Sequence, residues 1–231
     1  MKRMLLAASL VALLVPPAAL AAPREPGPAS FTTEIDNPYL PLKPGSRWVY
    51  RETDTEGTKQ KIVVTVTNQT KLIANGVTAR VVRDTVTEKG ALVEDTFDWY
   101  AQDRKGNVWY LGEDTKDYEN GKVVSTEGSF EAGVDGAKPG IAMLAKPRPG
   151  MQYSQELYKG HAEDKARVLS RDDQAEVPAG HYRRVLMTKD FNPLEPKVLE
   201  YKLYAKGVGL VLAVGVSGGS EREELIRFKK G

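Results

Sequence analysis

The sequence predicts an all-β fold: an antiparallel meander, internally duplicated, that forms a curved or barrel-like sheet around a single core. From Trp48 onward, short runs rich in β-branched residues alternate with turns of Gly, Asn and Asp. No stretch of helical length carries a 3.6-residue apolar period. The 231-residue chain has no cysteine, so a hydrophobic core rather than disulfide bonds must stabilise it.

Residues 1–21 have the pattern of a secretory signal peptide. Lys2 and Arg3 precede an apolar run, and residues 19–21, Ala-Leu-Ala, form a small-x-small cleavage site. The run is too short to span a bilayer, and Pro23 stands where a bacterial lipoprotein would need cysteine. We therefore expect an exported protein, periplasmic or extracellular, with no membrane span after cleavage and no lipid anchor.

Residues 22–43 are rich in proline and lack periodicity, which predicts an extended N-terminal arm. Residues 44–131 follow as the first meander half. Its strand-like runs are separated by turn signals at Lys89-Gly90, Asp103–Gly106 and Asn120-Gly121, the last being a strong hairpin signal.

Residues 132–148 break this pattern with clustered Gly and Pro, which predicts a linker loop with one short helical turn at residues 141–144. Residues 149–231 then form the second meander half. "PGSRWVY" at Pro44 matches "PGMQYSQ" at Pro149, and "FDWYAQD" at Phe97 matches "YKLYAKG" at Tyr201. Matches in the same order at nearly constant spacing indicate duplication around one core.

The stretch "EDTFDWYAQDRKGNVWYLGEDT", residues 94–115, combines aromatic side chains with carboxylates and suits either a binding surface or a hairpin. Alternation along a strand, aligned on the second half, places Phe97 and Trp99 inside and turns Asp98 and Tyr100 outward. The spacing around Gly106 does not fit an EF-hand calcium loop. We thus interpret the stretch as structural. The predicted core aromatics are Trp48, Phe97, Trp99, Tyr153 and Tyr201.

Charge and motifs narrow the function. The chain has 33 Lys and Arg against 31 Asp and Glu, and removing Lys2 and Arg3 makes these counts equal. This balance disfavours nucleic-acid binding. The lack of cysteine excludes thiol catalysis and thiolate metal sites. The sequence contains no nucleophile, zinc-protease, phosphate-loop or dinucleotide motif, so catalytic residues stay unknown.

One set of polar residues around the linker could converge on a polar ligand or a divalent ion, or supply an acid–base pair. Calcium is the one cofactor these side chains would suit, and otherwise no cofactor is predicted. A solvated sheet surface explains the same residues, and the sequence leaves both interpretations open. The set comprises Glu127, Glu131, Gln155, Glu156, His161, Glu163 and Asp164.

Three stretches, "EGSFEAG" at 127–133, "AED" at 162–164 and "GVGLV" at 207–211, resemble a family of uncharacterised exported bacterial β-rich proteins. The similarity extends over most of residues 37–215. This chain departs from the family wording at Phe130, where the family has Trp, and at His161, where it has an acid. The resemblance implies an exported β fold with no assigned reaction, so it transfers no functional residue.

Three functions fit these observations. The first is an exported, non-catalytic β protein that binds a small molecule or a partner protein in the bacterial envelope. The second is a carboxylate-based hydrolase or divalent-metal-dependent enzyme, and the third is a purely structural envelope module. Converging carboxylates would favour the enzyme, an internal cavity the binding protein, and a filled interior the structural module.

Overall fold

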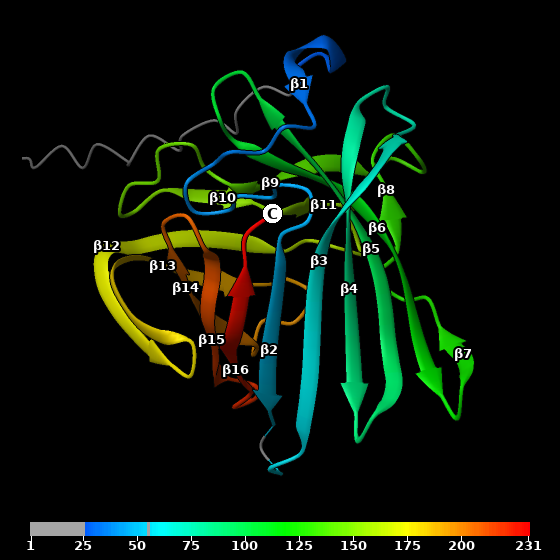
Figure 1. Ribbon diagram of the computed structural model, residues 1–231. Coiled ribbons are helices and arrows are strands. Elements are labelled where there is room, and N and C mark those ends of the chain that lie inside the picture. Colours follow the sequence, from blue (N-terminus) through cyan, green and yellow to red (C-terminus); the bar gives the residue numbers. More distant parts are fainter. Residues whose placement is uncertain (1–25, 55) are drawn as a thin grey trace, which may run out of the picture.

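The computed structural model describes residues 26–54 and 56–231, and Figure 1 shows a nearly closed, barrel-like antiparallel sheet. Within these ranges the regular structure consists of strands and one short 3₁₀ turn, η1 (Pro28–Ser30). The predicted all-β class is therefore confirmed. The predicted signal peptide lies outside the described residues.

The strands follow the chain in two groups. The first group is β1 (Phe31–Thr32), β2 (Arg47–Thr53), β3 (Lys59–Leu72), β4 (Thr78–Glu88), β5 (Ala91–Asp103), β6 (Val108–Glu119), β7 (Lys122–Ser125) and β8 (Phe130–Glu131). The second group is β9 (Lys138–Met143), β10 (Gln152–Ser154), β11 (Glu156–Leu157), β12 (Lys165–Val177), β13 (Gly180–Phe191), β14 (Leu199–Ala205), β15 (Gly209–Ser217) and β16 (Arg222–Lys229).

Two uninterrupted meanders make up most of the sheet, β2 to β6 and β12 to β16. They join where the last strand, β16, pairs antiparallel with β2, and Figure 1 shows these strands side by side in red and blue. Trp48 stacks on Phe228 across this seam, with ring centroids 5.0 Å apart. Two such meanders are what a duplicated chain would form, and the duplication itself stays a prediction.

A single chain segment closes the other side of the barrel. Its first part, β10, pairs with β12, while its second part, β11, pairs with β9. Gln155 lies between the two, at the point where the segment changes partner. A Cβ on Gly140 of β9 would overlap the backbone carbonyl of Gln155, so glycine is what permits this close approach.

The predicted linker loop is wrong in its central part. Residues 138–143 form strand β9 rather than a loop with a helical turn, because Ile141 pairs with Trp109 of β6 and Pro139 pairs with Glu156. Backbone pairing on both sides overrides the Gly and Pro composition, which by itself disfavours a strand. The turn predictions held: Asn120 and Gly121, both with positive φ, connect β6 to β7.

The predicted direction of the side chains in β5 is also wrong. Asp98 and Tyr100 line the interior, whereas Trp99, between them, is buried on the opposite face. Trp99 packs there with Val81 in a separate cluster, and the β3–β4 turn contributes Ile73 and Val77 to the same cluster. Around Trp99 the outer face of the first meander is therefore apolar and covered, while the inner face of β4 and β5 carries Asp84 and Asp98.

The predicted core aromatics divide accordingly. Trp48 and Tyr153 belong to the main core, and Trp99 belongs to the outer cluster with Lys71 Nζ 4.3 Å from its ring centroid. Phe97 and Tyr201 are only half-buried, so the prediction overstates their burial. Phe97 and Tyr201 point away from the lumen, because their neighbours Asp98 and Lys202 line the interior cavities.

Replacing Trp99 with Ala should lower the free energy of unfolding by about 3–5 kcal/mol, because it empties the centre of the outer cluster. Chemical denaturation measures this loss. Tyr118→Ala, at a half-buried tyrosine of β6, is the control and should cost less. A loss no larger than the control's would contradict the assignment of Trp99 to a packed cluster.

Replacing Gly140 with Ala should destabilise the protein by roughly 1–3 kcal/mol, since its Cβ would push the closing segment away from β9. Gly27→Ala is a matched control, because a Cβ there meets nothing and the φ of −65° is ordinary. Equal melting temperatures for the two variants would refute the closure contact.

Candidate functional site

The interior of the barrel contains two adjoining cavities, of about 330 and 320 Å³. Four residues line both: Tyr100, Ala142, Gln155 and Lys202. We call the first the acidic chamber; its other lining residues are Tyr110, Glu156, Asp164, Asp190, Phe191, Asn192, Glu195, Val198 and Glu200. We call the second the aromatic chamber; its other lining residues are Leu40, Leu42, Trp48, Tyr50, Val64, Val82, Asp84, Asp98, Tyr204, Gly209, Leu210 and Glu223.

The closing segment brings its polar side chains to the acidic chamber. The backbone carbonyl of Asp164 accepts hydrogen bonds from the amides of Gln155 and Glu156, at 2.7 and 3.2 Å. These bonds hold the Glu156 carboxyl beside that of Asp164. Burial, and then the hydrogen bond and charge of Asp164, raise the pKa of Glu156 to about 9. Glu156 is therefore protonated at neutral pH and hydrogen-bonded to the side chain of Asp164.

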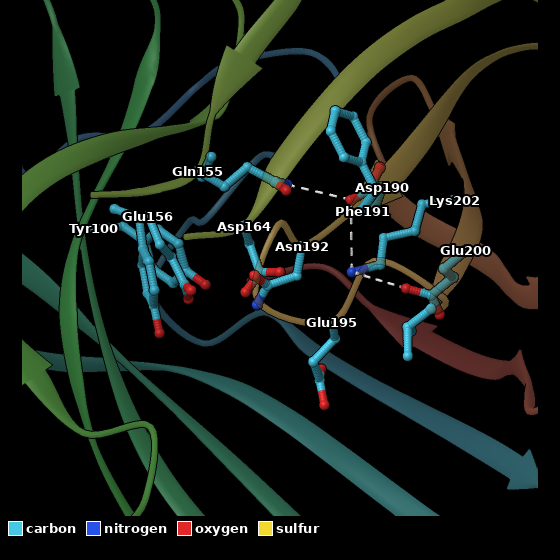
Figure 2. A pocket seen from close by; sticks show the side chains of 13 residues that line it. Tyr100, Gln155, Glu156, Asp164, Asp190, Phe191, Asn192, Glu195, Glu200 and Lys202 are labelled. Atoms are coloured by element: carbon cyan, nitrogen blue, oxygen red, sulfur yellow. Dashed lines mark hydrogen bonds and ion pairs between the residues drawn. The ribbon is translucent and has the colours of Figure 1, made fainter. Parts of the chain in front are cut away.

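Lys202 of β14 is the centre of a polar network in the same chamber (Figure 2). Its Nζ lies 3.1 Å from Glu200 Oε2 and 3.7 Å from Asp190 Oδ2. The side-chain amide of Gln155 donates to Asp190 Oδ2 at 3.3 Å, and Thr188 Oγ1 donates to Asp190 Oδ1 at 2.6 Å. Side chains from β13, from β14 and from the closing segment thus hold Asp190 in place.

Charge pairing and burial compete in this network. Burial lowers the pKa of the Lys202 ammonium, but Glu200 and Asp190 outweigh it, so that pKa stays well above its usual value. For Asp190 the balance is reversed: burial raises its pKa, and Lys202 offsets only part of the rise. Lys202 thus remains charged, and one ammonium faces two neighbouring carboxyl groups.

The aromatic chamber combines ring faces with carboxyl groups that have few partners. Trp48 Nε1 donates to the carbonyl of Val208 at 2.7 Å, and the Tyr50 hydroxyl donates to that of Leu210 at 3.0 Å. Asp84 Oδ1 is different, because it is buried and none of the residues that the structure describes hydrogen-bonds to it. Burial raises the pKa of Asp84 to about 7 and that of Glu223 to about 8.

A tyrosine connects two further carboxyl groups at the edge of the chambers. The Tyr110 hydroxyl lies 2.8 Å from Asp98 Oδ1 and 2.9 Å from Glu113 Oε2. A phenol has one proton to donate, so forming both bonds requires that one carboxyl group be protonated. Burial raises the pKa of Asp98 well above its usual value and that of Glu113 to about 7, which agrees with this requirement.

The structure brings together three of the predicted site residues, since Gln155, Glu156 and Asp164 all line the acidic chamber. The other four lie elsewhere. Glu163 accepts a hydrogen bond from the amide of Gly160 at 2.9 Å. His161 is exposed and stacks on Tyr158, with ring centroids 4.3 Å apart.

Glu127 and Glu131 do not join the chambers either. Glu127 is exposed in the turn after β7. Glu131 ties the β3–β4 turn in place, accepting from the amide of Ala74 at 2.7 Å and pairing with Lys71 Nζ at 2.9 Å. The expected meeting of "EGSFEAG" with residues 153–164 takes place through Phe130 and Tyr158, whose ring centroids are 6.3 Å apart.

Sequence reasoning missed most of the remaining polar lining. Its members are Asp84, Asp98, Asp190, Glu195, Glu200, Lys202 and Glu223. A signal existed in β4, where Val82, Asp84 and Val86 share one face although Asp is rare on an apolar face. In β5 and β14 the sequence gives no such signal, because the face that points away from the lumen has more apolar residues than the lumen face and so looks like the core face.

The structure describes residues 26–54 and 56–231. Among them, no group of three or more His, Cys, Asp or Glu side chains is arranged to hold a metal ion. In the same part of the chain, none of the helical structure has the length and hydrophobicity of a membrane span.

No family model matches the chain, and no curated protein matches it. Two solved structures are similar over most of their length. A candidate lipoprotein from Parabacteroides distasonis is 13% identical, covering 83% of this chain and 98% of its own, with a TM-score of 0.46. A β-barrel-like protein of a domain of unknown function from Brucella abortus is 12% identical, covering 80% and 96%, with a TM-score of 0.39.

The buried carboxyl groups predict that stability falls as pH rises. In the unfolded chain, Asp84 and Glu223 ionise near 3.8 and 4.5, whereas in the folded protein their pKa values are about 7 and 8. Between these two sets of pKa values the folded state binds more protons than the unfolded chain. The stability that protonation contributes is therefore complete below pH 4 and is lost as pH rises through 7 and 8.

We therefore expect a lower melting temperature at pH 8.5 than at pH 5.5, corresponding to a loss on the order of a few kcal/mol. Glu223→Gln should reduce this difference, because the amide keeps the shape and removes the ionisation. Differential scanning calorimetry at the two pH values provides the measurement. An unchanged or higher melting temperature at pH 8.5 would show that these carboxyl groups are not buried as described.

Proposed function

We propose that this protein is an exported, non-catalytic binding protein that holds a small molecule inside its barrel. The observation that carries the proposal is the pair of adjoining cavities, each of about the volume that small-molecule sites occupy. A purely structural module would be expected to fill its interior with side chains. Export is supported by the signal-like pattern of residues 1–21, and family membership by the "EGSFEAG", "AED" and "GVGLV" stretches.

The composition of the lining also supports binding. Ring-bearing and aliphatic side chains provide apolar contact in the aromatic chamber, and fixed polar groups converge in the acidic chamber. Apolar surface beside oriented polar groups is the combination by which small-molecule sites hold and orient a ligand. Ala142 lies where the two chambers meet, so one ligand can occupy both.

Filling the shared space is the direct test. Ala142→Phe should place a ring between the two chambers and abolish ligand retention while the barrel remains folded. Ala91→Phe, at an exposed position of β5, is the matched control and should retain ligand like the unmodified protein. Native mass spectrometry of each protein, purified from its own bacterial host, detects the retained molecule.

The expected outcome is a bound small molecule in the unmodified protein and the Ala91 variant, and at least about a tenfold lower occupancy in the Ala142 variant. Equal occupancy in all three proteins would place the ligand outside the barrel. Absence of any ligand in the unmodified protein, together with no binding by added probes, would refute the proposal.

One observation favours hydrolysis as a second candidate function. A protonated Glu156 lies beside Asp164 inside the acidic chamber, and two neighbouring carboxyl groups can act as general acid and base. The two functions differ in what is recovered. Binding leaves the same molecule in the unmodified protein and in Glu156→Gln, whereas hydrolysis leaves a cleaved product in the former and an intact substrate in the latter.

A further inference from the structure

We propose that the ligand is a protonated organic amine with an apolar body, and that Asp84 binds its N–H group in the aromatic chamber. This inference rests on the proposed function, because it names the chemical class that the barrel holds.

The charge of the lining is the first reason. Among the described residues that line the two chambers, Lys202 is the one basic side chain, and its Nζ is already paired with Glu200 and Asp190. The acidic side chains that line them are Asp84, Asp98, Glu156, Asp164, Asp190, Glu195, Glu200 and Glu223. The described lining therefore offers an anion no unpaired basic side chain, whereas its carboxyl groups can compensate a bound cation by releasing protons.

Asp84 supplies an independent and more local reason. Its Oδ1 is buried and has no hydrogen-bond donor among the described residues, and the Asp84 side chain lines the aromatic chamber. A buried carboxyl oxygen without a donor carries a desolvation cost that a partner would remove. The missing partner is therefore a donor that enters the chamber, and an ammonium N–H is the donor that also carries the complementary charge.

The rings around Asp84 suit the same group. Trp48, Tyr50, Tyr100 and Tyr204 line the chamber with it. Aromatic faces attract cations, and their apolar surface accommodates an aliphatic or aromatic body. Leu42 and Val64 extend that apolar wall.

The competing cations fit less well. A metal ion needs several oxygen ligands at about 2.4 Å, and the described side chains provide no such group of three or more. A quaternary ammonium would be attracted by the rings but has no N–H for Asp84 Oδ1. Burial raises the pKa of Asp84 to about 7, so a bound ammonium would take the place of the carboxyl proton.

Three probes with the same chain separate charge from hydrogen bonding: hexylamine, hexan-1-ol and hexyltrimethylammonium. Isothermal titration calorimetry on protein stripped of retained ligand measures the affinity of each. We expect hexylamine to bind at least about tenfold more tightly than hexan-1-ol, and hexyltrimethylammonium to lie between them. Asp84→Asn should remove the preference for hexylamine while leaving hexan-1-ol binding unchanged within about threefold.

Glu127→Gln is the control, because it removes one negative charge at an exposed position outside the chambers. It should leave all three affinities unchanged. Melting curves establish that Asp84→Asn is folded, and Glu223→Gln, in the same chamber, provides a second variant if it is not.

The outcomes separate this inference from the proposed function. Equal binding of hexylamine and hexan-1-ol, or a preference that survives Asp84→Asn, overturns the amine assignment while the barrel remains a binding protein. Failure of all three probes, with a ligand still retained in an Ala142-dependent manner, also overturns the amine assignment alone. Failure of the probes together with no retained ligand overturns both.

Discussion

The contact between Gly140 and the backbone of Gln155 is the constraint on which the rest of the barrel depends. Residues 152–157 pair first with β12 and then with β9, so one short segment joins the two free edges of the sheet. Without a glycine in β9 the two backbones could not approach closely enough to pair. The same change of partner turns Gln155 and Glu156 toward the cavity, so barrel closure and site formation have a single cause.

The interior differs from an ordinary protein core because carboxyl groups occupy it. Each ionised carboxylate away from bulk water is costly unless a cation or several donors stabilise it, and Lys202 serves two neighbours. Other carboxyl groups reduce the cost by holding protons, as Glu156 does beside Asp164 and as one of the two carboxyl groups at the Tyr110 hydroxyl does. Apolar packing elsewhere must support this arrangement, and the outer cluster around Trp99 is part of that support.

The sequence predicted what local chemistry decides. The β class, the Asn120-Gly121 turn and the Asp103–Gly106 turn follow from backbone preferences. Gln155, Glu156 and Asp164 are predicted because polar side chains cluster around the predicted linker. The sequence does not predict which face of β5 points inward. Alternation distinguishes the two faces of the strand, but it does not reveal that the β3–β4 turn covers the face that carries Trp99. Trp99 was assigned correctly as buried and incorrectly as luminal, and Asp98 was consequently assigned to solvent. Strand β9 depends on partners distant in sequence, which composition does not reveal.

The seam between β16 and β2 has a consequence for how the chain acquires its fold. Arg51 and Glu224 form an ion pair across it although they are 173 residues apart in sequence. Contacts of such high sequence separation form late, because the loop entropy must be lost before they contribute. The N-terminal meander therefore lacks its neighbour until the last strand has been synthesised. A chain that still lacks β16 exposes the backbone edge of β2, and an unpaired strand edge is where a second chain can pair and start aggregation.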